Sequence, residues 1–251
     1  MIAKRAILIV AAAALLAPGA SAQNRRGEGV FRGGFFENRP YDGRYTFVRL
    51  RYTQSLGRRG GGGWEHDYPT AEQHFTRLLL ELTNVRARTW ASNILTLDDP
   101  ELTKYPIAYM SEPGYWFPSD SEVLGLRNYL LKGGFVIFDD FEGAHLNNLI
   151  QQMERIIPGV RMFRLDTNHP IFDSFYRVKS LEYYHPQERT PSTFYGIFED
   201  NDPKKRMIAI ANHNNDIGDY WEWSATGMYG IDPSNEAYKL GINYIIYAMS
   251  R

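Results

Sequence analysis

The sequence predicts an α/β fold in which helices cover both faces of a mostly parallel β-sheet. Residues 135–138 form a continuous apolar run that is too short for a helix and follows two glycines, as is typical of a strand buried on both faces. Amphipathic helical patterns lie on either side of this run, and further strand patterns occur before and after them. Strands that alternate with helices in this way indicate a doubly wound sheet.

The first strand and helix are expected within residues 45–82. Residues 45–52 have the aromatic and β-branched bias of a strand. The run Gly60–Gly63 could cradle a phosphate, but it lacks the Lys-Ser/Thr ending of a P-loop and the spaced glycines of a dinucleotide site, so a flexible loop is expected. Thr70 and Gln73 have the spacing of a capping box at a helix start. The apolar stripe of this helix comprises Phe75, Leu78, Leu79 and Leu82.

The helix before the central apolar run has clear start and stop signals. Ser119 and Glu122 have the spacing of a second capping box, in which each side chain accepts a hydrogen bond from a backbone N–H of the other residue. Apolar residues then recur at helical spacing at Val123, Leu126, Tyr129 and Leu130. Gly133 and Gly134 are expected to end the helix, because glycine adopts positive φ without a steric penalty.

A second amphipathic helix is expected after the central run, and it ends at Pro158-Gly159. Its apolar positions are Leu146, Leu149, Ile150, Met153, Ile156 and Ile157. Other short strand patterns occur at residues 94–97, 107–110 and 160–165.

The last third of the chain predicts loops, a hairpin and a C-terminal helix. Residues 173–192 show no regular pattern, whereas residues 194–198 and 207–211 predict a β-hairpin. Asp232 followed by Pro233 is typical of a helix start, with an N-cap and then proline at the first helical position. Leu240, Tyr244 and Tyr247 are expected on one face of this helix.

Composition excludes several classes of chemistry. The chain has 251 residues, of which 43% are hydrophobic and 14% aromatic, enough for a sizeable core. Its formal net charge is −1, so bulk charge indicates neither a nucleic acid nor an anionic membrane as partner. Cysteine is absent, which excludes disulfides, thiolate metal sites and cysteine nucleophiles.

The N-terminus predicts export. Lys4 and Arg5 precede an apolar run at residues 6–16 and then Ala20-Ser21-Ala22, which is the layout of a secretory signal peptide. Cleavage is expected after Ala22, and the run is too short to span a membrane. The sequence therefore predicts a signal peptide at residues 1–22, a flexible leader at 23–44 and a single α/β domain at 45–251, located in the periplasm and without a membrane span.

Acidic residues after the central strand form the first candidate site. Asp139 and Asp140 follow the strand directly, with Glu142 and His145 shortly after them. In open α/β sheets ligands bind outside the carboxyl ends of the strands, and Glu112 ends another strand that is expected to face the same crevice. Paired carboxylates suit acid–base chemistry or a hard cation. The structural alternative is that these acids stabilise the N-terminus of the following helix.

Residues 212–223 form the second candidate site. They include His213, Asp216, Asp219, Trp221, Glu222 and Trp223 on an expected loop after a buried strand. Flat aromatic rings beside carboxylates and amides are typical of carbohydrate-binding surfaces. The alternative is a polar loop whose side chains bond their own backbone. His66-Asp67 is a weaker signal, in which the carboxylate would fix the tautomer of the imidazole.

The chain resembles a family of domains of unknown function, DUF4159. The resemblance is carried by FVRLRY, GGGWEHDYPTAEQHF, DDPELTKYPIAYMSEPGYW, SDSEVLGLRNYLLKGGFVIFDDFEG, NHPIFDSFY, HNNDIGDYWEW and NEAYKLGINYIIYA, which cover nearly all of residues 45–249. The family is similar to class I glutamine amidotransferase-like domains, which implies a three-layer, flavodoxin-like fold. Catalytic amidotransferases place a cysteine after the central strand, where this chain has Asp139-Asp140-Phe141. Amidotransferase activity is therefore excluded, and the resemblance supplies no catalytic residue.

Three functions remain open on these grounds. The first is an exported domain that binds a small molecule, such as an envelope glycan, above Glu112 and Asp139-Asp140. The second is a metal-assisted hydrolase that uses Asp139, Asp140, Glu142 and either His145 or His213. The third is an envelope protein that binds a protein partner through its leader and the Trp221–Trp223 loop. No catalytic residue, cofactor or metal is assigned, and no nucleic-acid partner is expected.

Overall fold

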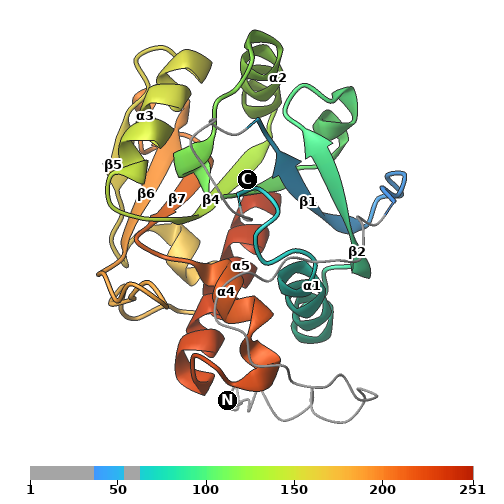
Figure 1. The fold of residues 1–251 in the computed structure, drawn as a ribbon, viewed down its shortest axis with the longest axis vertical. Helices are drawn as coiled ribbons and strands as arrows, with labels where there is room; N and C mark the ends of the chain where they lie inside the picture. Colours follow the sequence, from blue (N-terminus) through green and yellow to red (C-terminus); the bar gives the residue numbers. More distant parts are fainter. Residues whose placement is uncertain (1–36, 54–62, 251) are drawn as a thin grey trace.

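The computed structural model describes residues 37–53 and 63–250. The predicted signal peptide, most of the predicted leader and Gly60–Gly62 lie outside this part of the chain. The strands are β1 (Tyr45–Arg51), β2 (Ala87–Thr96), β3 (Ile107–Ser111), β4 (Phe135–Phe141), β5 (Met162–Arg164), β6 (Thr193–Phe198) and β7 (Met207–His213). The α-helices are α1 (Thr70–Leu82), α2 (Asp120–Leu131), α3 (His145–Ile156), α4 (Ile217–Glu222) and α5 (Ile231–Met249) (Figure 1).

The strands of the described chain form one seven-stranded sheet in the order β2-β1-β3-β4-β7-β6-β5. Neighbours from β2 to β7 pair in parallel, and β6 runs antiparallel to both β7 and β5. The predicted mostly parallel sheet is thus confirmed, as is the hairpin, in which Thr193 of β6 pairs with His213 of β7.

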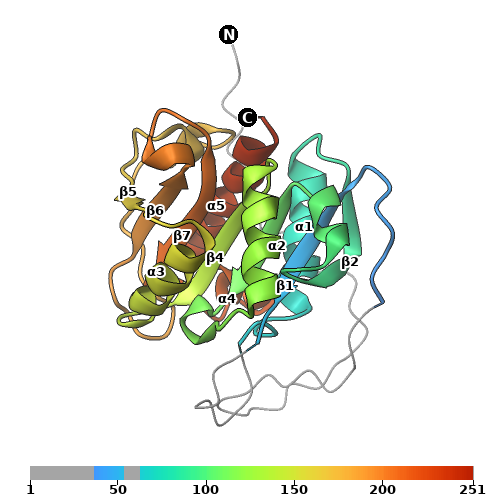
Figure 2. The same cartoon turned by 90° about the horizontal axis from the view of Figure 1, so that it is seen from above.

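Helices cover both faces of this sheet, and β4 contributes to both cores. Phe135 and Ile137 of β4 belong to one apolar cluster with residues of α1, α4 and α5. Val136 and Phe138, which point the opposite way because side chains alternate along a strand, belong to a second cluster with residues of α2 and α3. Figure 2 shows these two helical layers on opposite sides of the strands. Burial on both faces explains why β4 is a continuous apolar run.

The predicted ends of α2 are confirmed. The backbone N–H of Ser119 donates to Glu122 Oε2 at 2.8 Å, and the backbone N–H of Glu122 donates to Ser119 Oγ at 3.3 Å, which completes the capping box. Gly133, just past the helix, has a φ of 113°. A side chain would strain the backbone there, so glycine is the residue that allows the turn into β4.

Two other predicted helix starts are wrong in detail. Helix α1 begins at Thr70 but has Pro69 in the N-cap position and no side-chain capping bond. The N–H groups of Ala71 and Gln73 bond the backbone carbonyls of Asp67 and Pro69 instead. Helix α5 begins at Ile231, so that Asp232 and Pro233, expected as N-cap and first helical residue, both lie inside the first turn.

Strand boundaries differ from prediction at both edges of the sheet. β2 begins at Ala87 rather than Ile94, because it pairs along β1 from Tyr45 onward through an irregular register that contains Trp90 at a φ of 67°. Such a bulge breaks the alternation by which strands are recognised. β5 covers only Met162–Arg164 of the expected residues 160–165.

Residues 37–44 lie beside the edge strand β2. The side chain of Asn38 bonds the backbone of Ile94 twice, donating to its carbonyl and accepting from its N–H, each at 2.8 Å. The backbone of Arg39 exchanges two further hydrogen bonds with the side chain of Asn93. This segment therefore satisfies part of an otherwise open sheet edge. No helix among the described residues is long and apolar enough to cross a membrane.

Candidate functional site

A cavity of about 300 Å³ lies at the carboxyl ends of β3, β4 and β7, and His66 on the connection that leaves β1 also lines it. Its acidic lining residues are Glu112, Asp140, Glu142, Glu188 and Asp216, and its imidazoles are His66, His145 and His185. Such a concentration of acceptor oxygens gives the cavity a strongly acidic character. The crevice expected above the carboxyl ends of the strands therefore exists in the structure.

The cavity brings together residues from both predicted candidate sites. Glu112, Asp140, Glu142 and His145 come from the strand ends and the acidic cluster, and Asp216 comes from the segment after β7. The other predicted site residues, Asp139, His213, Asp219 and Trp221, do not line it.

Asp139 does not line the cavity beside Asp140; its side chain forms hydrogen bonds inside the protein. Its carboxylate is fully buried and accepts hydrogen bonds from Tyr109 Oη and Asn212 Nδ2, both at 2.8 Å. It also accepts from the backbone N–H groups of Ile217 (2.9 Å) and Gly218 (3.1 Å) at the start of α4. Burial raises the pKa of Asp139 to about 7. The two carboxylates are part of β4 rather than following it, and they do not form the expected pair facing one crevice.

Asp140 has an unusual backbone at the end of β4 and faces the cavity. Its φ is 56°, and its Oδ2 lies 2.7 Å from His66 Nδ1 and 3.1 Å from Ser111 Oγ. Burial alone would raise the pKa of Asp140, but the hydrogen bond and charge of His66 bring it below its usual value. Burial conversely disfavours the imidazolium of His66, but the charges of Asp67 and Asp140 raise its pKa to about 10. At neutral pH the two side chains form an ion pair.

The residue next to His66 is a buried carboxylate without a hydrogen bond. Asp67 has a φ of 64°, and neither of its carboxylate oxygens has a hydrogen-bond partner. Its Oδ1 lies 3.4 Å from His66 Nδ1, and its side chain has no exposed surface. Burial raises the pKa of Asp67 well above its usual value, and His66 opposes this rise.

Arg49 of β1 fixes the segment that carries these two residues. Its guanidinium donates to the backbone carbonyls of Trp64 at 3.0 Å and His66 at 2.7 Å, and it pairs with Glu72 of α1 at 2.5 Å. All of Arg49 is buried. The guanidinium therefore connects β1, the segment before α1, and α1 itself.

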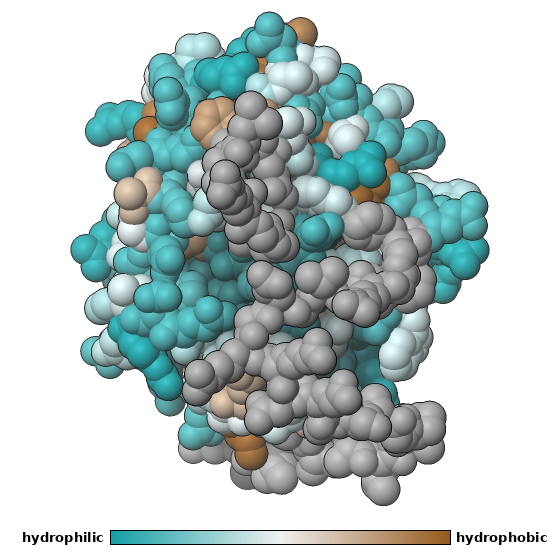
Figure 3. Space-filling model, in the orientation of Figure 1, coloured by the Kyte–Doolittle hydropathy of each residue, from teal (hydrophilic) through white to brown (hydrophobic). Residues whose placement is uncertain are grey.

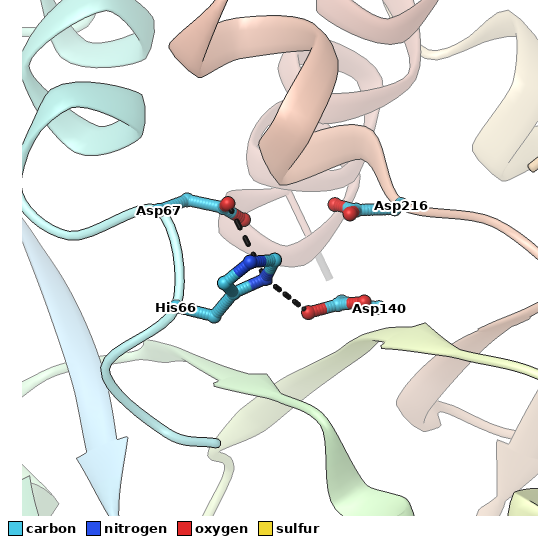
Figure 4. A group of neighbouring side chains, drawn as sticks. All are labelled: His66, Asp67, Asp140 and Asp216. Carbon is cyan, nitrogen blue, oxygen red and sulfur yellow. Dashed lines mark hydrogen bonds and ion pairs between the residues drawn. The ribbon is translucent and has the colours of Figure 1, made fainter. Parts of the chain in front are cut away.

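Asp216 holds the start of α4 and also points to His66. Its Oδ1 accepts from the backbone N–H of Asp219 at 2.8 Å, whereas its Oδ2 is buried without a hydrogen-bond partner. Burial raises the pKa of Asp216 well above its usual value. Together His66, Asp67, Asp140 and Asp216 each offer one ligand atom, and these atoms all lie within 4.8 Å of one another (Figure 4). A second such group consists of Asp67, Asp219 and Glu222.

His185 comes from the loops at residues 173–192, where the sequence showed no regular pattern and predicted no site. Its Nδ1 accepts from the backbone N–H groups of Gln187 at 3.3 Å and Glu188 at 3.2 Å. A nitrogen that accepts carries no proton, so the proton of His185 is on Nε2 and makes it a donor. Gln187 and Glu188 line the cavity beside it. No motif marks these residues, and only the fold brings them to the site.

Trp221 does not contribute to the carbohydrate-binding surface that is expected at residues 212–223. Trp221 is 1% exposed and stacks on Phe75 of α1 with ring centroids 4.4 Å apart, so its ring belongs to the core. Residues 217–222 are helix α4 rather than a loop. His213 lies 3.0 Å from the carbonyl of Gly143 through Nε2, and Asp219 Oδ2 accepts from Gln187 and Tyr229.

A family model described as a domain of unknown function, DUF4159, matches residues 46–249. The comparison with curated proteins finds no match.

Proposed function

Because the chain belongs to the DUF4159 family, whose description names no activity, we propose a function from the site itself: the acidic cavity binds a small polar ligand. The observation that carries this proposal is the position of the cavity relative to the strand order of the sheet. β1 and β3 are neighbours, but the helix that follows β1 packs on one face and the helix that follows β3 packs on the other. Where the connections of two neighbouring strands go to opposite faces of the sheet, a crevice forms between them. Ligands of doubly wound sheets bind in this crevice.

The cavity residues fit that position. His66 lies on the connection that leaves β1, and Glu112 directly follows β3. The strand order β2-β1-β3-β4, continued by β7, matches the order of flavodoxin-like sheets and supports the flavodoxin-like, amidotransferase-like fold that the sequence resemblance implies. In this proposal Asp140, at the end of β4, takes the place of the cysteine that a catalytic amidotransferase has after its central strand.

Backbone conformation around the cavity supports a binding role. Asp67, Glu112 and Asp140 have φ values of 64°, 48° and 56°, although none is glycine. Each such conformation costs about 1–3 kcal/mol, and they concentrate where function requires a particular side-chain placement. All three residues are acidic and lie at or next to the cavity.

The lining restricts the chemistry of the ligand. Carboxylates accept hydrogen bonds and repel anions, so an amine or a hydroxyl-rich molecule such as a sugar fits better than a free phosphate or carboxylate. Tyr115, whose ring lies 4.7 Å from that of His145, offers an aromatic wall. The sugar alternative depends on this wall, because Trp221 is buried.

Hydrolysis is a second candidate, favoured by the contact of 2.7 Å between Asp140 and His66. In this version the Asp140 carboxylate would accept a proton from the attacking water, and the His66 imidazolium would donate a proton to the leaving group. Asp139 and His213, which the predicted hydrolase would use, take no part in this version, since neither lines the cavity.

Thermal-shift screening of purified protein against amines, amino sugars and neutral sugars tests the proposal. Compounds that stabilise the wild type should stabilise Glu142→Gln and Glu188→Gln less, because both variants remove charge from the cavity rim. Glu101→Gln, an exposed acid paired with Lys104, is the matched control and should respond as the wild type does. The proposal fails if no compound stabilises the wild type, or if the rim variants respond fully. Incubation of any hit with the protein, followed by mass spectrometry, shows whether it is hydrolysed.

We also propose that the protein acts outside the cytoplasm, on the strength of the N-terminal sequence pattern. Cell fractionation with N-terminal sequencing should find a mature protein that begins at Gln23.

A further inference from the structure

We propose that a divalent cation binds at the inner end of the cavity, held by His66, Asp67, Asp140 and Asp216. This inference rests on the proposed function only in that the cation would share the cavity with the ligand. The four residues come from three segments: His66 and Asp67 from the turn before α1, Asp140 from the end of β4, and Asp216 from the turn before α4. Figure 4 shows their side chains converging on one region.

The spacing of the four side chains suits a single ion. Their ligand atoms lie within 4.8 Å of one another. Ligands of a divalent cation lie ~2.0–2.4 Å from it, so two ligands of the same ion cannot be more than about 4.8 Å apart. The contact of 2.7 Å between His66 Nδ1 and Asp140 Oδ2 is close to the separation of adjacent ligands. An ion would replace the proton that now lies between these two atoms.

Buried carboxylate oxygens without hydrogen bonds are a second, independent reason to expect a cation at this position. Both carboxylate oxygens of Asp67 and Oδ2 of Asp216 are buried and have no hydrogen-bond partner in the described part of the chain. The two residues are 5% and 1% exposed, and the side chain of Asp67 has no exposed surface. Leaving a buried carboxylate unpaired is costly, whereas a cation would compensate both groups at once.

Arg49, the neighbouring buried cation, acts on Asp67 only through its charge at a distance. The hydrogen bonds of Arg49 go to Glu72 and to two backbone carbonyls, and none goes to Asp67 or Asp216. Imidazolium at His66 is a single positive charge among three carboxylates. With all three carboxylates ionised, a divalent cation beside neutral His66 would give the group a net charge of −1 instead of −2.

Supporting bonds hold the proposed ligands in place. Ser111 Oγ donates to Asp140 Oδ2, and the backbone N–H of Asp219 donates to Asp216 Oδ1. Each of these two carboxylates therefore still has an oxygen lone pair that can bind the ion. The other acidic group is less suitable, because Asp219 Oδ2 already accepts from Gln187 Nε2 at 3.0 Å and Tyr229 Oη at 2.9 Å.

The donor set indicates which ions to expect. One imidazole nitrogen with three carboxylates suits Mn²⁺, Fe²⁺ or Zn²⁺ better than Mg²⁺ or Ca²⁺, which prefer oxygen alone. A six-coordinate ion with four protein ligands keeps two positions, and these would accept oxygen atoms of the cavity ligand or water.

Calorimetric titration of EDTA-treated, dialysed protein with MnCl₂ and ZnCl₂ tests the inference. We expect one ion per chain in the wild type. Asp67→Asn and Asp216→Asn should each weaken its affinity about tenfold or more. The matched control Asp120→Asn, at a fully exposed position on α2, should bind as the wild type does. Lack of binding to the wild type, or equal binding by all variants, would overturn the inference.

Thermal melts show whether weaker cation binding by a variant is caused by a folding defect. In EDTA, Asp67→Asn should melt at or above the wild-type temperature, because it removes a buried carboxylate that has no hydrogen-bond partner among the described residues. With saturating Mn²⁺ the wild type should gain roughly 5 °C and the variant should not. A variant that gains as much as the wild type would contradict the proposed site.

The same samples separate this inference from the proposed ligand. If the protein binds the cation but no screened compound stabilises it, the cation site stands and the proposed function fails. If a compound binds equally well in EDTA and no cation binds, the proposed function stands and the cation site fails.

Discussion

At the scale of single residues, the buried carboxylates of Asp139 and Asp67 differ in their hydrogen bonding. Asp139 and Asp67 are both buried, yet Asp139 accepts hydrogen bonds from four donors and Asp67 from none. Burial raises the pKa of both, and only Asp139 has donors that favour its charged form. The same side-chain type therefore has opposite consequences for stability at the two positions.

This contrast predicts opposite effects of the same substitution. At pH 8, above the pKa of about 7 for Asp139, the variant Asp139→Asn should lower the free energy of unfolding by about 2–4 kcal/mol, because an amide cannot accept from all four donors. Asp67→Asn should leave it unchanged or raise it. Urea denaturation in EDTA measures both. Equal destabilisation by the two variants would show that hydrogen bonding does not distinguish the two sites.

At the scale of elements, the sequence could predict the helices and central strands but not all their ends. The capping box at Ser119 and the glycine stop at Gly133 give the two boundaries of α2. The same capping pattern failed at Thr70, because Pro69 directly before it takes the N-cap position and Thr70 already lies in the helix. Short-range patterns locate an element reliably only where no neighbouring residue competes for the same backbone groups.

The two predicted capping boxes can be compared directly. Ser119→Ala removes an acceptor for the N–H of Glu122 and should lower the free energy of unfolding by about 1 kcal/mol. Thr70→Ala should change it by less than about 0.5 kcal/mol or raise it, because no side-chain cap exists at α1 and alanine favours helix. Urea denaturation of both variants checks this. A larger loss from Thr70→Ala than from Ser119→Ala would contradict the structure of these two helix starts.

At the scale of the whole molecule, strand order assembles a site that sequence reasoning found only in parts. Asp140, Glu112 and Asp216 were predictable because they stand near the carboxyl ends of strands. His66 and His185 were not recognised as members of this site, since their contribution depends on which connections lie side by side above the sheet. Local sequence patterns do not show which distant segments of the chain lie side by side in the fold. The part of the face in Figure 3 that is not drawn in grey is mainly hydrophilic, with scattered hydrophobic residues.

The shared sheet also predicts how the molecule unfolds. β4 gives alternate side chains to the core beneath α1 and α5 and to the core beneath α2 and α3, so loss of either core exposes the other face of the same strand. We therefore expect both layers to open together as one cooperative unit, as the prediction of a single domain over residues 45–251 requires. Hydrogen-exchange mass spectrometry in increasing urea measures this. The slowest amides of α5 and of α3 should converge on one opening free energy and one urea slope, and a lower value for α2 and α3 alone would show that the layers unfold separately.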